Sequence, residues 1–179
     1  EGQLDLDPLK LVFIDETSIS TKMARRFGWA PQGERCRAAV PFGHWATTTL
    51  IAALRFDRID APMTIDGALD GASFLAYVEQ VLAPTLCAGE TVVMDNVSTH
   101  KVAGVREAIE ARGASVLYLP RYSPDFNPIE KSFSKIKSIM ERIAARTADA
   151  LEAAVGEALR SFTPQECMNY FAASGYDAV

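Results

Sequence analysis

The chain has 179 residues, of which 49% are hydrophobic, which suits one folded domain with its own core. Its 18 Lys and Arg residues against 23 Asp and Glu residues give a net charge of −5, which argues against binding nucleic acid by electrostatics alone. Three separated cysteines indicate neither a disulfide framework nor a zinc cluster, and no apolar run approaches the roughly 18 residues of a membrane span. We expect a single cytoplasmic domain over residues 1–179.

The first predicted elements are strands. An apolar, β-rich run over 9–14 predicts a buried strand that ends at Asp15. The following segment, 16–34, is polar and contains glycine and proline, so it is predicted to be a loop. Residues 35–42 and 46–56 are rich in Val, Thr, Ile and Phe, and they predict a hairpin. The sheet would therefore begin with three consecutive strands.

Helices and strands alternate in the middle of the chain. A passage broken by turn residues, 59–71, leads into a predicted helix over 72–86, where apolar residues recur at helical spacing. Three further elements are predicted: a strand over 91–94, a helix from about 101 to 112 that ends at a left-handed Gly113, and a strand over 115–119.

The last third of the chain is predicted to be helical. Three prolines within 120–128 bar a helix there, and an apolar stripe over 129–143 predicts one directly afterwards. Thr147 and Thr163 are suited to cap two closing helices. The order of elements predicts an α/β protein with a mixed central sheet flanked by helices.

Two aspartates have matching places in this order. Asp15 follows the strand residues LVFI, Asp95 follows TVVM, and a polar residue comes after each. Ligands of open α/β sheets bind just beyond the strand ends, where two acids can hold a hard cation such as Mg²⁺. An aspartate in this place also commonly caps the next turn, so the pattern alone leaves both interpretations open.

Glu130 is the third acidic candidate. Asn127 as N-cap, Pro128 and Glu130 form the pattern of a capping box, in which the carboxylate would accept from the backbone N–H of Asn127. Helical geometry also places Glu130 on the flank of the apolar stripe, from which it could face the sheet edge. Lys131 and Lys135 fall on the opposite, outward side of this helix, where they would meet phosphates or solvent.

With these residues in place, the chain resembles the catalytic domain of bacterial insertion-sequence transposases of the mariner superfamily. The matching segments are FIDET, VVMDNVSTH and YSPDFNPIEKSFSKIK, and Phe126 replaces the usual leucine of the last motif. Between Asp95 and Glu130 lie 34 residues, the interval that this superfamily uses. Such transposases carry helix-turn-helix modules upstream, and nothing in residues 1–179 resembles one.

The resemblance implies an RNase H-like fold with Asp15, Asp95 and Glu130 as catalytic residues and metal ligands. It implies cleavage of phosphodiester bonds at transposon ends, followed by attack of the freed 3′-hydroxyl on target DNA. Two Mg²⁺ ions per site, replaceable by Mn²⁺, suit such in-line displacement, with Asp15 touching both. The implied partners are DNA and a second copy of the chain, and the implied location is the bacterial nucleoid. With DNA recognition on upstream modules, the acidity of this domain is no contradiction.

Supporting roles are predicted for several other residues. Asn96 and Asn127 are candidate second-shell donors to the metal ligands. His100 could approach a phosphate or a metal-bound water, or it could be a structural hydrogen-bonding residue. Trp29 and Trp45 could stack on bases, but local packing is favoured.

Other functions are compatible with the same acids. An RNase H-like endonuclease or resolvase would use them without strand transfer, and a repurposed domain would only bind DNA or partner subunits. Titration with Mn²⁺ distinguishes the repurposed domain from an enzyme, because the absence of carboxylate-dependent binding would favour the non-enzymatic domain. A phosphatase of the haloacid dehalogenase type is disfavoured, because it needs an acid two positions after Asp15 and Thr17 occupies that place.

Overall fold

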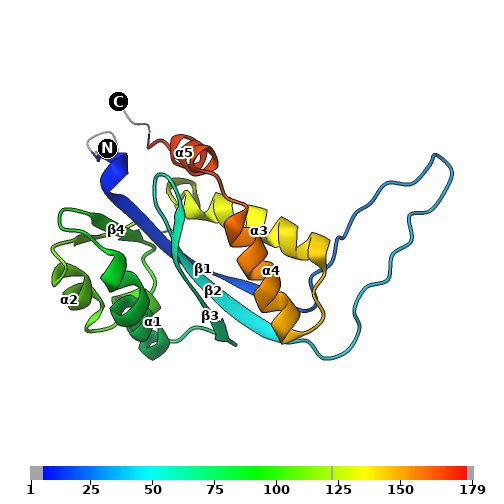
Figure 1. Ribbon diagram of the computed structural model, residues 1–179, viewed down its shortest axis with the longest axis horizontal. Coiled ribbons are helices and arrows are strands. Elements are labelled where there is room, and N and C mark those ends of the chain that lie inside the picture. The colour runs from blue at the N-terminus through cyan, green and yellow to red at the C-terminus, as the bar shows by residue number, and fades with distance from the viewer. Residues whose placement is uncertain (1–5, 122, 177–179) are drawn as a thin grey trace.

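A single mixed sheet organises the computed structural model, which describes residues 6–121 and 123–176. Its strands lie in the order β3-β2-β1-β4-β5 (Figure 1). The first three are antiparallel neighbours, and β4 and β5 continue the sheet parallel to β1. The strands are β1 (Leu11–Ser20), β2 (Thr47–Leu54), β3 (Ile59–Asp66), β4 (Thr91–Met94) and β5 (Ser115–Tyr118). This arrangement confirms the predicted mixed sheet and the RNase H-like fold.

Strand β1 is longer than predicted. It continues to Ser20 instead of ending at Asp15, because β2 pairs with it from Phe13 onward. Asp15 therefore lies inside a strand, whereas Asp95 directly follows β4 as predicted. The two aspartates do not occupy equivalent strand ends.

The predicted hairpin over 35–42 and 46–56 is wrong in its first half. Only the second segment forms a strand, β2, and its hairpin partner is β3, in the passage predicted to be broken. Strand β3 lies at the sheet edge, where Pro62 is tolerated because an outward-facing position needs no N–H donor. A register shift between Ile51 and Ala53 accompanies this irregular strand.

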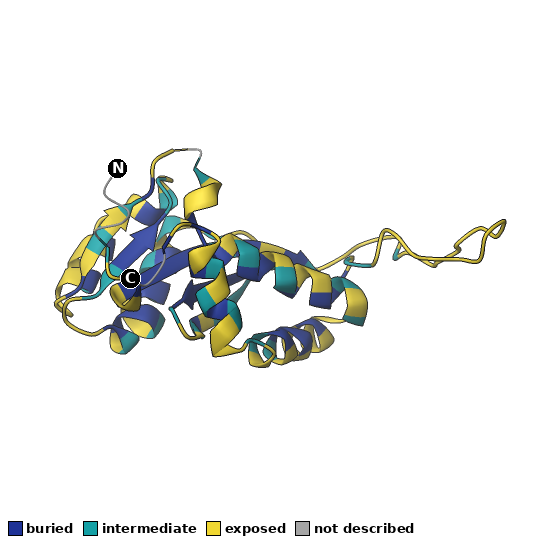
Figure 2. Cartoon of the chain, turned by 90° about the horizontal axis from the view of Figure 1, so that it is seen from above, coloured by how far each residue is buried: buried dark blue, intermediate teal, exposed yellow. Residues whose placement is uncertain are grey.

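Residues 22–46 form an extended arm that contains no helix or strand and projects away from the sheet (Figures 1 and 2). Its large apolar side chains are uncovered: Trp29 and Phe42 are fully exposed, and Trp45 is about half exposed beneath the ammonium of Lys22. The expectation of local packing is wrong for Trp29, which no other residue of the described chain covers, whereas Trp45 is half covered and packs under Lys22.

Helices cover both faces of the sheet. One face carries α3 (Ile129–Ile143), α4 (Ala148–Arg160) and α5 (Pro164–Ala172), and the other carries α1 (Gly71–Tyr77) and α2 (Val105–Glu110). A π-helical segment (Val78–Leu82) and a 3₁₀ turn (Ala83–Thr85) extend α1 over the predicted range. Helix α2 begins later than predicted, because a 3₁₀ turn (Thr99–Lys101) and a left-handed Gly104 precede it.

Two buried clusters hold these layers together. Phe13, Phe133 and Phe171 belong to the cluster beneath α3, α4 and α5, while Ile14 and Phe74 belong to the cluster beneath α1 and α2. Alternation along β1 explains the division, since consecutive residues point to opposite faces. None of the helices in the described ranges is long and apolar enough to span a membrane.

Candidate active site

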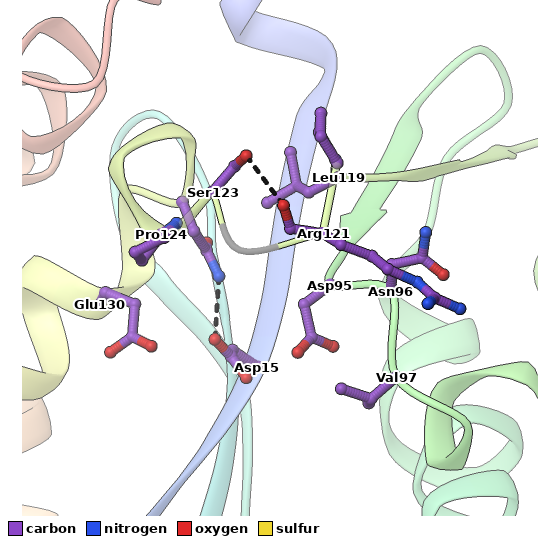
Figure 3. Close-up of a pocket in the computed structure, with 11 residues that line it drawn as sticks. Asp15, Asp95, Asn96, Val97, Leu119, Arg121, Ser123, Pro124 and Glu130 are labelled. Carbon is purple, nitrogen blue, oxygen red and sulfur yellow. Dashed lines mark hydrogen bonds between the residues drawn. The ribbon is translucent and has the colours of Figure 1, made fainter.

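A pocket of about 390 Å³ opens where β1, the end of β4 and the start of α3 meet (Figure 3). Asp15, Asp95 and Glu130 all line it, and their carboxylates point into the same space from three different elements. The structure thus brings together the three acids on which the sequence analysis converged. Their roles as metal ligands and catalytic residues remain predictions.

Parallel pairing of β1 with β4 sets the two aspartates side by side. The ladder pairs Leu11 with Thr91 and Phe13 with Val93. The same register, continued by two residues, places Asp15 opposite Asp95. Neighbouring strands lie about 4.8 Å apart, so these two acids are held close by the backbone itself.

Asp15 is fixed by hydrogen bonds and nearly buried. The residue is only 8% exposed. Its carboxylate accepts hydrogen bonds from the backbone N–H of Glu16 and from Nδ2 of Asn127, each at 2.8 Å. Burial, the largest cause, and the charges of Glu16, Asp95 and Glu130 together raise the pKa of Asp15 to about 7, against the lowering effect of the Glu16 N–H. Without a bound cation, this site therefore disfavours a charged Asp15.

Glu130 does not form the predicted capping box. The N-cap of α3 is Pro128, with no side-chain cap, and the backbone N–H of Asn127 donates to the carbonyl of Pro124 at 2.9 Å. The side chain of Asn127 turns to Asp15 instead. The Glu130 carboxylate is consequently directed into the pocket from the first turn of a rigid helix.

His100 lies behind the pocket rather than in it. Its ring is fully buried, with Nδ1 in an ion pair with Asp95 and Nε2 2.9 Å from Oε2 of Glu16. Burial lowers the pKa of His100, but the hydrogen bonds to Asp95 and Glu16 outweigh this and raise it to about 10. Of the two predicted roles of His100, this geometry fits the structural hydrogen-bonding residue and not a contact with phosphate or a metal-bound water, because both ring nitrogens are engaged inside the protein.

Of the other residues predicted to support the site, the two asparagines lie beside the acids and the two lysines do not. Asn96 lines the pocket and accepts a hydrogen bond from Lys101, and buried Asn127 bonds Asp15, so both adjoin the acids. Lys131 and Lys135 do not point outward as predicted. Lys131 donates to Ser174 at 2.7 Å, and Lys135 donates to Glu166 at 2.6 Å, so both pack against the C-terminal helix and the turn that follows it.

Two residues at the site were missed by the sequence analysis. Arg121 is the one cationic side chain among the described residues that line the pocket, and no spacing signal marks it. Glu16 was noted only as the polar neighbour of Asp15. Alternation along β1 gave a usable signal, because it sends Glu16 to the sheet face opposite Asp15, where His100 is buried.

The donor set of the pocket fits a hard divalent cation. Carboxylate oxygens are the ligands that Mg²⁺ and Mn²⁺ prefer, and a cation would relieve the unfavourable charge of Asp15. Across residues 6–121 and 123–176, however, no three His, Cys, Asp or Glu side chains already form a cluster that could hold a metal ion. Binding an ion would therefore require the carboxylates to close around it by side-chain rotation.

Fold and pocket together define an RNase H-like domain with three acids in one pocket beside its central strands β1 and β4. The family model for the DDE superfamily endonucleases matches residues 10–152, which include all three acids and most of the chain. The chain belongs to this family. No match was found among curated proteins.

Solved structures of a mariner transposase have the same fold. The pre-cleavage Mos1 transpososome superposes with a TM-score of 0.71 at 14% identity, over 92% of this chain and 52% of that one. The mariner Mos1 paired-end complex with Mg gives 0.71 at 16% identity, with the same shares of both chains. The catalytic domain of Mos1 gives 0.64 at 13% identity, over 92% of this chain and 76% of that one. The chain thus spans about half the length of the transposase chains in the two complexes.

Proposed function

We propose that this protein is the catalytic domain of a DNA transposase, of the kind found in bacterial insertion sequences of the mariner superfamily. It would cleave phosphodiester bonds at transposon ends and transfer the freed 3′-hydroxyl into target DNA. One observation carries this proposal: Asp15, Asp95 and Glu130 converge in one pocket of a DDE-family fold. The Mos1 complexes with paired ends and with Mg or Mn support it by similarity of fold.

In this proposal the three carboxylates hold two divalent ions, Mg²⁺ or Mn²⁺. The ions, when bound, supply activation of the attacking oxygen and stabilisation of the leaving oxygen. The chain's own contribution is rigid placement. Asp15 lies within a paired strand and accepts two hydrogen bonds, and Glu130 projects from the first turn of α3. With the backbone held in this way, side-chain rotation alone would bring the carboxylates around the ions.

Arg121 is proposed to contact the DNA phosphate backbone. It lines the same pocket as the acids and is exposed to solvent. A guanidinium suits phosphate because its planar donors can bind two oxygens at once. A local cation beside the metals would offset the net charge of −5 at the one place where DNA must approach.

We also propose that two copies of the protein act together on two DNA ends. The arm over residues 22–46 is the observation that favours an assembly, because Trp29, Phe42 and Phe27 are each more than 90% exposed. Uncovered aromatic side chains on one segment are typical of an interaction surface. Sedimentation of the intact protein with and without DNA ends would show the proposed dimer.

The test of the catalytic proposal is cleavage by the intact protein of DNA that carries the element's ends, in the presence of Mg²⁺. Asp15→Asn, Asp95→Asn and Glu130→Gln should each abolish cleavage while the protein remains folded by circular dichroism. Glu152→Gln, an exposed change on α4 outside the acidic pocket, is the matched control and should retain cleavage. Cleavage that persists in one acid variant would remove that residue from the site. Pre-cleaved ends that never join target DNA would favour an endonuclease or resolvase.

A further inference from the structure

His100 joins two acids that lie on different elements. Its Nδ1 is paired with Asp95, in the loop after β4, and its Nε2 lies 2.9 Å from Glu16, on β1. Neither carboxylate is deeply buried, since the side chains of Asp95 and Glu16 are 38% and 30% exposed, whereas that of His100 is 0% exposed. The buried ring therefore connects two partly solvated carboxylates from behind the pocket.

The ring of His100 is itself immobilised. It stacks on Phe74 of α1, with ring centroids 4.4 Å apart and planes inclined by 30°. The hydroxyl of Tyr118, on β5, donates to the His100 carbonyl at 3.3 Å. The residue lies in the 3₁₀ turn Thr99–Lys101, so both its backbone and its side chain are held in place.

Asp95 has more need of such support than the other two acids. Asp15 lies inside a paired strand and accepts two hydrogen bonds, and Glu130 starts a helix of 15 residues. Asp95 instead lies in a loop, one residue past a strand of only four residues. The side chain of Asp95 is held by its ion pair with His100.

We infer that His100 and Glu16 form a positioning pair that orients the Asp95 carboxylate for metal binding. This inference rests on the proposed function, because it concerns how one of the three proposed ligands is held. Glu16 accepts from Nε2 and so fixes the direction of the ring, and the ring holds Oδ1 of Asp95. The other carboxylate oxygen is left to face the pocket. Outer partners of this kind typically change metal affinity by about 10- to 100-fold when removed.

The alternative is that His100 only stabilises the hydrophobic core and has no role in metal binding. In that case, replacing it would lower the melting temperature without a specific effect on metal binding. His100→Phe distinguishes the two roles, because a phenyl ring can keep the stack on Phe74 but cannot contact Asp95. Because Oδ1 of Asp95 is itself buried, His100→Phe is also expected to lower the melting temperature, and the Mn²⁺ affinity is the measurement that separates the two roles.

The experiment is calorimetric titration of the intact, metal-free protein with Mn²⁺, together with the melting temperature of each variant. We expect His100→Phe to weaken Mn²⁺ binding by about 10- to 100-fold. Val105→Ala, a cavity change in the core cluster that also contains Phe74, is the matched control and should lower the melting temperature while binding Mn²⁺ normally.

Glu16 supplies a second test that does not alter the core. Glu16→Ala should weaken Mn²⁺ binding, and Glu16→Gln should restore most of it, because the amide oxygen can still accept from Nε2. Normal binding by both His100→Phe and Glu16→Ala, with binding lost in Asp95→Asn, would overturn the positioning role alone. A wild-type protein that binds no Mn²⁺ would overturn the proposed metal site and, with it, this inference.

Discussion

Asp15 and Asp95 line the same pocket at the junction of β1 and β4, and each lies two residues beyond the paired residues Phe13 and Val93 of the parallel ladder. Only Asp15 remains inside the sheet, because β2 continues to pair with β1 beyond the point where β4 ends. One acid is therefore nearly buried while the other is partly solvated. The burial of Asp15 raises the pKa of its carboxyl to about 7.

The raised pKa of Asp15 predicts that metal binding depends on pH near neutrality. A proton on Asp15 competes with the cation, and its pKa is about 7 in the metal-free protein. The association constant for Mn²⁺ should fall about tenfold per pH unit below pH 7 and level off above it. Calorimetry between pH 5.5 and 8.5 measures this slope, and a constant affinity from pH 5.5 to 7 would contradict it.

The raised pKa of Asp15 also predicts that its charged carboxylate lowers the stability of the metal-free fold. The folded pKa of Asp15, about 7, exceeds the ordinary value of 3.8, so its contribution to stability is fully present below pH 3.8 and is lost as pH rises through 7. At pH 8 the metal-free protein should therefore gain stability from Asp15→Asn, by an amount of the order of 4 kcal/mol at most.

Thermal melts at pH 5 and pH 8 check this prediction. The advantage of Asp15→Asn over the wild type should be larger at pH 8 than at pH 5, and added Mn²⁺ should stabilise only the wild type. An Asp15→Asn protein that melts below the wild type at pH 8 would show that burial does not penalise the charged carboxylate.

Arg121→Ala should weaken DNA binding in a salt-dependent way. Loss of one phosphate contact should reduce the slope of log K against log salt by about 1. Arg160→Ala, at the end of α4 and outside the described pocket lining, is a control with the same loss of charge. Equal slopes for the two variants would remove Arg121 from the DNA contact.

Substitutions in the core should lower the free energy of unfolding far more than substitutions in the arm. Phe133→Ala removes a buried ring from the inner face of α3 and should cost about 3 to 5 kcal/mol of unfolding free energy. Trp29→Ser removes a fully exposed ring and should change that free energy by less than about 0.5 kcal/mol. Chemical denaturation measures both values, and a large loss from Trp29→Ser would show that the arm packs on the domain.

Local patterns predicted the elements whose signals are complete within a few residues. The apolar stripe over 129–143, the caps at Thr147 and Thr163, and the strand before Asp95 all have their causes in neighbouring residues, and the structure confirms them. The local pattern also marked the three acids of the pocket as candidates, but it left capping roles open, and the resemblance to the mariner-superfamily motifs singled them out.

Features that depend on distant partners could not be predicted in this way. The extension of β1 past Asp15 comes from its pairing with β2, and β3 forms a strand despite Pro62 because it lies at a sheet edge. The contact between Glu16 and His100 joins residues 84 positions apart. Periodicity within a segment carries no information about which other segment will lie beside it.

The central claim is that Asp15, Asp95 and Glu130 together bind divalent metal ions. Anomalous diffraction from a crystal of the protein soaked in Mn²⁺ tests it most directly. We expect anomalous peaks in the pocket, within coordination distance of all three carboxylates, and their loss in Asp95→Asn. Crystals with no peak in this pocket at saturating Mn²⁺, or with peaks that Asp95→Asn leaves unchanged, would contradict it.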